Sequence, residues 1–194
     1  GGASATGAGM RFAQPYGRMN IDIGGGRTNV SVFSFGHQIV WDILNVGGDR
    51  FDDAIIDYLR KKHNLLIGAR TAEELKIDIG SARMRGVKLE MDACGRSLVS
   101  GLPRAVTVSS EEMIEALDEP LRDLMSALHR MIERTPPELA SDIFDEGIIL
   151  SGGGAQLFGL DGVISDQLKI RTTLADEPDL CVAHGLSELI DDED

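Results

Sequence analysis

The stretch Ile148-Ile149-Leu150-Ser151-Gly152-Gly153-Gly154 decides the fold, because a short buried-type strand runs directly into three glycines. The apolar spacing after this stretch predicts a helix over about 160–168. In a strand–glycine–helix order, main-chain amides can face an anion and a ligand can approach the backbone closely. The order is typical of an α/β fold, and it is a better context for ligand binding than an isolated glycine run.

A second triple glycine, Gly24–Gly26, lies within a predicted β-meander. Its strands are expected at 19–23, 30–33 and 38–44, because apolar and β-branched residues cluster there between turn residues. Three glycines between strands have two interpretations. They form either a permissive turn or a backbone that a ligand must approach closely, and the run alone does not decide between them.

The middle of the chain, from about residue 48 to 109, mixes helical and strand patterns. A helix opens at Gly47-Gly48, since its apolar residues recur three and four positions apart, at Phe51, Ala54, Ile55, Tyr58 and Leu59. The spacing of Thr71 and Glu74 predicts a capping box that starts a second helix over 72–81. Alternating apolar residues then predict short strands at 87–91 and 106–108.

The last part of the chain continues with helices and single strands. Ser109 and Glu112 repeat the capping-box spacing. The elements expected after them are helices over 110–118 and 120–134, a helical turn over 138–143, a strand over 148–150, the helix over 160–168, a strand over 172–174 and a final helix over 178–190. The helix over 120–134 has an apolar stripe that contains methionines, which is typical of a core face.

The composition is that of a soluble globular domain with room for one insertion: 194 residues, 42% hydrophobic and 26% charged. No apolar run approaches the roughly 18 residues of a membrane span. Residues 1–6 lack the pattern of a signal peptide, and no Met precedes Met10, so we expect a fragment. Cys94 and Cys181 lie far apart without a C-x-x-C spacing, and the histidines show no metal-ligand spacing. We therefore expect reduced, buried thiols in a cytoplasmic protein.

Acidic residues are concentrated in the last third of the chain. The net charge is −13, and residues 136–194 hold fourteen acids against the two bases Lys169 and Arg171. Nucleic acid is therefore disfavoured as a partner, because neutralising phosphates requires a basic surface. The simpler interpretation of these acidic residues is a surface exposed to solvent. The more specific alternative is a surface that binds a basic protein partner.

Three segments in colinear order carry a family resemblance. They are 22–28 (DIGGGRT), 47–55 joined to 67–82, and 135–143 running on to 147–155. Together they resemble the actin-like ATPases, and within them the MreB family of bacterial rod-shape proteins. The first segment is similar to the second phosphate loop of that family. The resemblance extends over nearly the whole chain, which makes it far more specific than one triple glycine.

The resemblance implies a ribonuclease-H-like mixed sheet with helices on both faces and an inserted smaller α+β subdomain. We expect residues 1–47 and 110–194 to form the ribonuclease-H-like part and residues 48–109 to form the insertion. This arrangement is similar to the second of the family's two large domains. The first phosphate loop and the glutamate that positions the attacking water have no counterpart here. No catalytic residue is therefore assigned, and we expect no meaningful ATP turnover by this chain alone.

ATP and Mg²⁺ are the cofactors that the resemblance implies. By resemblance, Asp22 holds Mg²⁺ through water. The amides of Gly24, Gly25 and Gly26 cradle the β- and γ-phosphates, and the Thr28 hydroxyl joins them. Phosphoryl transfer depends mainly on such positioning and charge stabilisation, so the implied roles agree with the residue types.

The resemblance also implies contacts to the nucleoside. Glu73 and Lys76 of the insertion would contact ribose or adenine. Gly152, Gly153 and Gly154 would let the adenosine lie against the backbone.

Each implied role has an ordinary structural alternative. The alternative for Asp22 is a turn acid at the end of a strand, and the alternative for Glu73 with Lys76 is an exposed ion pair on one helix face. With the resemblance, the nucleotide roles are favoured. The phosphate loop also departs from the family pattern, because Arg27 replaces its first threonine and Asn29 replaces an expected acid. Arg27 either adds a cation near the phosphates or points to solvent.

The implied function is that of an ATP-dependent, filament-forming cytoskeletal protein, cytoplasmic and located at the inner face of the cell membrane, which guides cell-wall synthesis and so controls cell shape. Self-association into filaments is the implied partnership. The first alternative is an interaction module that docks a membrane-anchored adaptor such as RodZ, to which the acidic region 136–194 suits a basic surface. The second is half of another actin-like filament protein, of the plasmid-segregation or magnetosome type.

Overall fold

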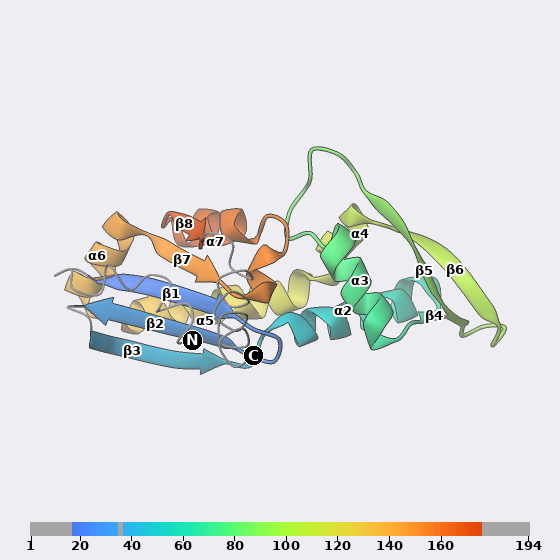
Figure 1. Ribbon diagram of the computed structural model, residues 1–194, viewed down its shortest axis with the longest axis horizontal. Coiled ribbons are helices and arrows are strands. Elements are labelled where there is room, and N and C mark those ends of the chain that lie inside the picture. The colour runs from blue at the N-terminus through green and yellow to red at the C-terminus, as the bar shows by residue number, and fades with distance from the viewer. Residues whose placement is uncertain (1–16, 35–36, 176–194) are drawn as a thin grey trace, which may run out of the picture.

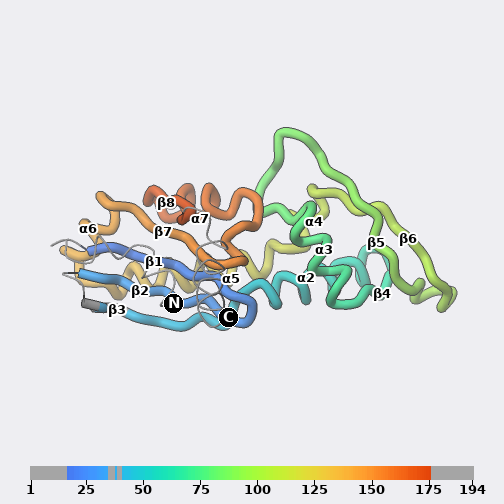
Figure 2. Tube along the Cα trace, viewed as in Figure 1, coloured from blue at the N-terminus to red at the C-terminus, as the bar shows by residue number. Residues whose placement is uncertain are grey.

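Two separate β-sheets lie toward the two ends of an elongated chain in the computed structural model, which describes residues 17–34 and 37–175 (Figure 1). The chain forms three strands of the first sheet, passes into the region of the second sheet, and returns to complete the first (Figure 2). A single cluster of buried apolar side chains includes residues from both regions.

The first sheet has five strands in the order β3-β2-β1-β7-β8. They are β1 (Arg18–Ile23), β2 (Thr28–Ser34), β3 (His37–Leu44), β7 (Ile148–Ser151) and β8 (Thr172–Leu174). The first three are antiparallel neighbours, whereas β7 runs parallel to β1 and β8 parallel to β7. The predicted α/β fold with a mixed sheet is therefore confirmed.

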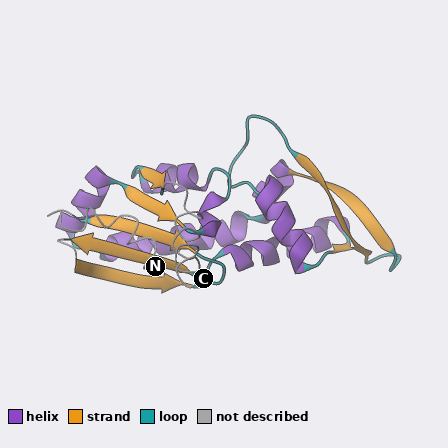
Figure 3. Cartoon of the chain, in the orientation of Figure 1, coloured by secondary structure: helices purple, strands orange, loops and turns teal. Residues whose placement is uncertain are grey.

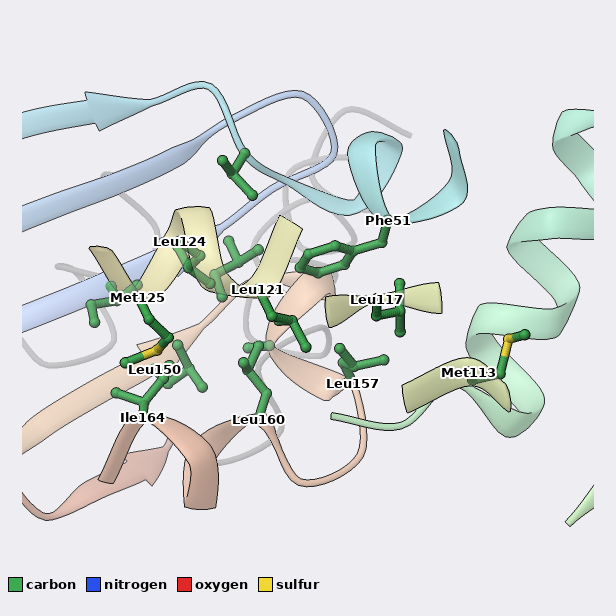
Figure 4. Close-up of a cluster of buried hydrophobic side chains, with 14 of the residues drawn as sticks. Phe51, Met113, Leu117, Leu121, Leu124, Met125, Leu150, Leu157, Leu160 and Ile164 are labelled. Atoms are coloured by element: carbon green, nitrogen blue, oxygen red, sulfur yellow. The ribbon is translucent and has the colours of Figure 1, made fainter. Parts of the chain in front are cut away.

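Two helices lie side by side on one face of this sheet, α5 (Asp118–Arg134) and α7 (Leu160–Leu168). Leu121 and Met125 of α5 pack with Leu150 of β7 and Ile164 of α7 (Figure 4). A third helix, α6 (Pro137–Glu146), contacts β1. The predicted final helix over 178–190 lies outside the described residues, so helices on both faces stay a prediction.

The second sheet has three antiparallel strands, β4 (Leu65–Leu66), β5 (Glu90–Ser97) and β6 (Pro103–Ser109). Three helices accompany it, α2 (Gly48–His63), α3 (Ala69–Ile79) and α4 (Ser110–Ala116) (Figure 3). All of these elements lie within or next to the predicted insertion. None of the described helices combines the length and the apolar character that a membrane span requires.

The two predicted capping boxes have opposite outcomes. The one at the start of α4 is confirmed, because the Glu112 amide donates to Ser109 Oγ at 3.2 Å and the Ser109 amide donates to the Glu112 carboxylate at 3.0 Å. The one at Thr71 is wrong, because α3 begins at Ala69 after an extended Gly68. Ala69 and Arg70 favour helix, so the helix starts before Thr71 can cap it.

The strand expected at 87–91 is misplaced. Val87 is exposed in the loop before β5, and the strand runs from Glu90 to Ser97. Its register with β6 sets these bounds, because β5 pairs along its length with residues 103–109. The helical turn expected over 138–143 is a longer helix, α6. The expectation of buried thiols is wrong for Cys94, which is free and exposed on β5.

Candidate functional site

The turn between β1 and β2 is closed by its own backbone. The Gly24 amide donates to the Arg27 carbonyl at 2.9 Å, and the antiparallel pairing resumes at Thr28 opposite Ile23. Gly25, Gly26 and Arg27 are exposed. The turn therefore presents its tip to solvent.

The carbonyls of this turn are held from behind by the start of α2. The Gly48 amide donates to the Gly24 carbonyl at 2.9 Å, and the Asp49 amide donates to the Gly25 carbonyl at 2.8 Å. Within the described chain, the amides of residues 25–27 donate no hydrogen bond. Successive exposed amides of this kind make an anion-binding concavity.

Gly47 permits the close contact between the start of α2 and the Gly24–Arg27 turn. This role was not predicted from the sequence. A Cβ on Gly47 would lie 2.6 Å from the carbonyl oxygens of both Gly24 and Gly25, closer than real side chains come. The signal in the sequence is a Gly-Gly pair directly before an amphipathic helix. α2 has no side-chain cap at this end, so the glycine serves close approach rather than capping.

Thr28 lies behind the turn rather than at its open side. Its side chain is fully buried, and its hydroxyl donates to the Val46 carbonyl at 2.6 Å. This bond fixes the start of β2 to the segment that leads into α2. The observed contact is structural, and a direct contact to a ligand stays a prediction.

The second glycine turn follows β7 at the same edge of the sheet, because Asp22 pairs with Ser151 in the parallel register. Gly152 has φ +90°, and a Cβ there would lie 2.4 Å from the Ile23 carbonyl oxygen and 2.5 Å from Asp22 Oδ1. A Cβ on Gly154 would lie 2.3 Å from Ile23 Cγ2. These two glycines are thus required by packing against the end of β1.

Asp22 therefore lies between the two turns. Its carboxylate is half-buried at the end of β1 and faces the Gly152 backbone. Within the described residues, no cluster of three histidine, cysteine or acidic side chains could hold a metal ion. A cation at Asp22 would need further ligands from water or from a bound molecule.

Lys76 reaches from α3 to the first turn of α2. Its Nζ lies 2.9 Å from Asp52 Oδ1 and donates to the Gly48 carbonyl at 3.2 Å. The expected alternative pairing with Glu73 is not formed, and Glu73 is exposed. Lys76 thus supports the helix start that holds the Gly24–Arg27 turn.

Burial and neighbouring charges act on the carboxyl group of Asp52 in opposite directions. Burial raises the pKa of the Asp52 carboxyl above its usual value, while Lys76 opposes this rise. The neighbouring carboxylates of Glu73 and Asp49 raise the pKa further. The Lys76 ammonium is therefore the main group that keeps Asp52 ionised.

A small hollow of about 100 Å³ joins the two predicted nucleoside-binding segments. It is lined by Lys76 and Ile77 of α3 and by Gly153, Gly154, Gln156 and Leu157 of the turn after β7. Typical small-molecule sites enclose several times this volume, so the hollow would cover a planar ring only in part. Glu73 does not line it.

A larger hollow of about 470 Å³ lies between α5 and α7, and none of the predicted site residues lines it. Its walls carry Arg122, His129, Arg130 and Glu133. It has no glycine turn and no exposed amides at a strand end. The smaller hollow beside the glycine turns is therefore the better candidate for a phosphate-bearing ligand, despite its size.

Comparisons with known proteins agree on one family. Residues 2–194 match the MreB/Mbl protein family. The chain is 43% identical over 191 residues to the cell shape-determining protein Mbl of Bacillus cereus, covering 98% of this chain and 57% of that protein. It is 44% identical over 183 residues to the cell shape-determining protein MreB of Escherichia coli K12, covering 94% and 53%.

A solved structure gives the same result. The crystal structure of MreB5 of Spiroplasma citri bound to ADP has a TM-score of 0.90 and 37% sequence identity, covering 95% of this chain and 56% of that one. The present chain thus spans about half the length of the proteins that it matches.

Proposed function

The chain belongs to the MreB/Mbl protein family, and from this membership we propose that it forms one side of the ATP-binding cleft of a filament-forming bacterial cytoskeletal protein that controls cell shape. The observation that carries the proposal is the Gly24–Arg27 turn. Its carbonyls are held by α2, and its amides at residues 25–27 are left open. ADP in the related MreB5 structure supports a nucleotide as the ligand.

The phosphates would bind at this turn. The amides of Gly25, Gly26 and Arg27 would donate to the β- and γ-phosphates, and the Arg27 guanidinium would add positive charge at the exposed side. Gly24 would act indirectly, since its amide is used to close the turn. Thr28 would position the turn through its bond to Val46.

Magnesium would be held mainly by the nucleotide. Asp22 would contribute one carboxylate, through water, at the point where the two glycine turns meet. When bound, the ion would neutralise charge on the phosphate oxygens. A single half-buried carboxylate beside open amides suits this role, because Mg²⁺ usually keeps several waters.

The nucleoside would lie in the hollow between Lys76 and the turn at Gly153 and Gly154. Gly152 would not contact the ligand. Its close packing against Ile23 of β1 would instead hold the turn at Gly153 and Gly154 in place. Glu73 would reach the ribose from the exposed side of α3. Because the hollow is shallow, we propose weak nucleotide binding by the 194 residues alone, roughly in the millimolar to high-micromolar range.

Filament formation, a position at the inner face of the membrane and control of cell shape are proposals for the whole protein. The names of the Mbl and MreB relatives support the role in cell shape. No feature of the described residues favours the adaptor-docking alternative or another type of filament over this role. We further propose no ATP turnover by the 194 residues alone, which a phosphate-release assay against buffer would check.

The test is a titration of the ¹⁵N-labelled chain with Mg²⁺–ATP. We expect saturable shifts of the amides of Gly25, Gly26 and Arg27, at the weak affinity given above. Gly26→Val should abolish these shifts, because a branched side chain would cover the open amides. The matched control is Gly86→Val, at an exposed loop glycine with open space around it. Shifts confined to the hollow between α5 and α7 would contradict the proposal.

A further inference from the structure

The segment that follows α3 is joined directly to the segment that precedes α7. Ser81 and Phe158 form an isolated parallel bridge, and the Ala82 amide donates to the Phe158 carbonyl at 2.8 Å. In the tube view, the loop after α3 reaches the start of α7 before it arches toward β5 (Figure 2). This contact joins the two sheet regions separately from the chain passages through α2 and α4.

Arg85 fastens this connection on several sides. Its guanidinium carbon lies 4.3 Å from the centre of the Phe158 ring, over the ring face. Its Nε donates to Ser81 Oγ at 2.8 Å, and its Nη2 donates to the Gly80 carbonyl at 3.1 Å. A guanidinium held by a ring and two oxygens is confined to one orientation.

Arg83, which lies in the segment after α3, joins the same connection to α7. A Cβ on Gly159 would lie 2.7 Å from Arg83 Cγ, and a Cβ on Gly162 would lie 2.5 Å from Arg83 Cζ. The side chain therefore lies in a slot made by two glycines. At its far end, Nη1 donates to Asp166 Oδ2 at 3.1 Å. The two glycines leave the space that this long side chain occupies.

These contacts lie next to the segments that line the hollow beside the Gly152–Gly154 turn. One wall of the hollow ends at Ile77, three residues before Gly80, and the other ends at Leu157, directly before Phe158. A Cβ on Gly80 would lie 2.9 Å from Leu157 Cδ1, so the two walls are in close contact there. The spacing between the walls is thus set where the two arginines fasten them.

We propose that Arg83, Arg85 and Phe158 form a clamp that sets the width of this hollow and so determines the affinity for the base of the bound nucleotide. They are positioning residues, because neither arginine nor the ring lines the hollow. The inference rests on the proposed nucleotide function and deepens it. The clamp acts on the nucleoside end alone, since it makes no contact with the Gly24–Arg27 turn.

The experiment compares two ligands on the 194-residue chain, Mg²⁺–ATP and Mg²⁺–tripolyphosphate, by NMR titration. Tripolyphosphate occupies the phosphate turn but has no base to place in the hollow. Arg85→Ala should weaken ATP binding by about fivefold, and tripolyphosphate binding by less than about twofold. A chain that is destabilised as a whole would instead lose both ligands equally, and its thermal unfolding would show it.

Three further variants make the test specific. Gly162→Ala displaces Arg83 while leaving its charge in place, and should weaken ATP binding in the same selective way. Phe158→Tyr keeps the ring under Arg85 and should bind ATP as the unmodified chain does. Arg70→Ala, on the exposed first turn of α3, is the matched arginine control and should change neither affinity.

The outcomes separate the two claims. A selective loss of ATP binding in Arg85→Ala and Gly162→Ala supports the clamp. Unchanged ATP binding, or an equal loss of both ligands, overturns it while the nucleotide function stands. Failure of the unmodified chain to bind either ligand overturns the proposed function, and the inference with it.

Discussion

The two triple-glycine turns have the same sequence signature and different physical reasons for it. At the first turn, a Cβ on Gly25 or Gly26 would meet nothing nearer than the Asp49 carboxylate, at 3.4 Å and 4.0 Å. At the second, a Cβ on Gly152 or Gly154 would lie within 2.5 Å of β1. The first turn is thus open toward solvent, and the second is packed against the strand beside it. A glycine run after a strand indicates close approach, without saying whether the approaching atoms belong to a ligand or to the protein.

The largest expected effect is a loss of folding stability at the second turn. Gly152→Ala should lower the free energy of unfolding by about 3 kcal/mol, because it adds strain at positive φ to a clash with backbone. Urea unfolding of the purified chain measures this change. A loss below about 1 kcal/mol would mean that the turn can move away from β1, and the contrast between the two turns would fail.

Gly47→Ala should have the next largest effect, about 2 kcal/mol, because its Cβ would push the start of α2 away from two carbonyls of the first turn. ATP binding should fall with it. Gly68→Ala is the matched control, since Gly68 also precedes a helix without a side-chain cap and has open space around it. Equal losses in the two variants would show that the cost belongs to helix capping and not to the turn.

Lys76→Met should cost about 1 kcal/mol near neutral pH, because it leaves the Asp52 carboxylate without its cation. The sign of the pH dependence follows from the pKa of Asp52, which burial raises and Lys76 lowers. A carboxyl with a raised folded-state pKa gives most stability when protonated, and this stability is lost as the pH rises through that pKa. The variant should therefore recover toward the parent between about pH 7 and pH 4. Unfolding curves that stay equally far apart over this range would contradict the assignment.

The smallest expected effect on folding is at the tip of the first turn. Gly26→Ala should change the free energy of unfolding by less than about 0.5 kcal/mol, because its Cβ would meet no atom nearer than Asp49 Oδ2, at 4.0 Å. ATP binding should nevertheless weaken several-fold, since the methyl group lies among the open amides. Calorimetric unfolding and an ATP titration on the same sample separate the two effects. A large loss of stability would show that the first turn, like the second, is packed against the protein.

The elements could be predicted where local patterns decided them. The apolar spacing from Phe51 to Leu59 placed α2, and the Ser109 and Glu112 pair placed the start of α4, because both depend on residues a few positions apart. The strand near 87–91 was misplaced because its true bounds depend on pairing with β6. The alternating apolar residues Val87, Leu89 and Met91 do not show at which residue this pairing begins.

The candidate site divides in the same way. Asp22 and the two glycine runs were singled out because each run stands in a short contiguous motif, and their contact with a ligand stays a prediction. The pairing of Lys76 with Asp52 could not, since it depends on how α3 packs across α2. Gly47 and Arg85 were missed for the same reason, because each acts on a segment that is distant in sequence and adjacent only in the fold.

The placement of α2 also has a mechanical consequence. Its first amides hold the Gly24–Arg27 turn, and the carbonyl of its last residue, His63, accepts a hydrogen bond from Arg104 of β6 at 3.3 Å. Its 16 residues make a rod about 24 Å long. Such a rod is a lever, because a tilt of about 5° at the turn displaces its far end by about 2 Å over that length. A change in the shape of the turn that tilted α2 by this angle would therefore displace the hairpin of β5 and β6 by a similar distance.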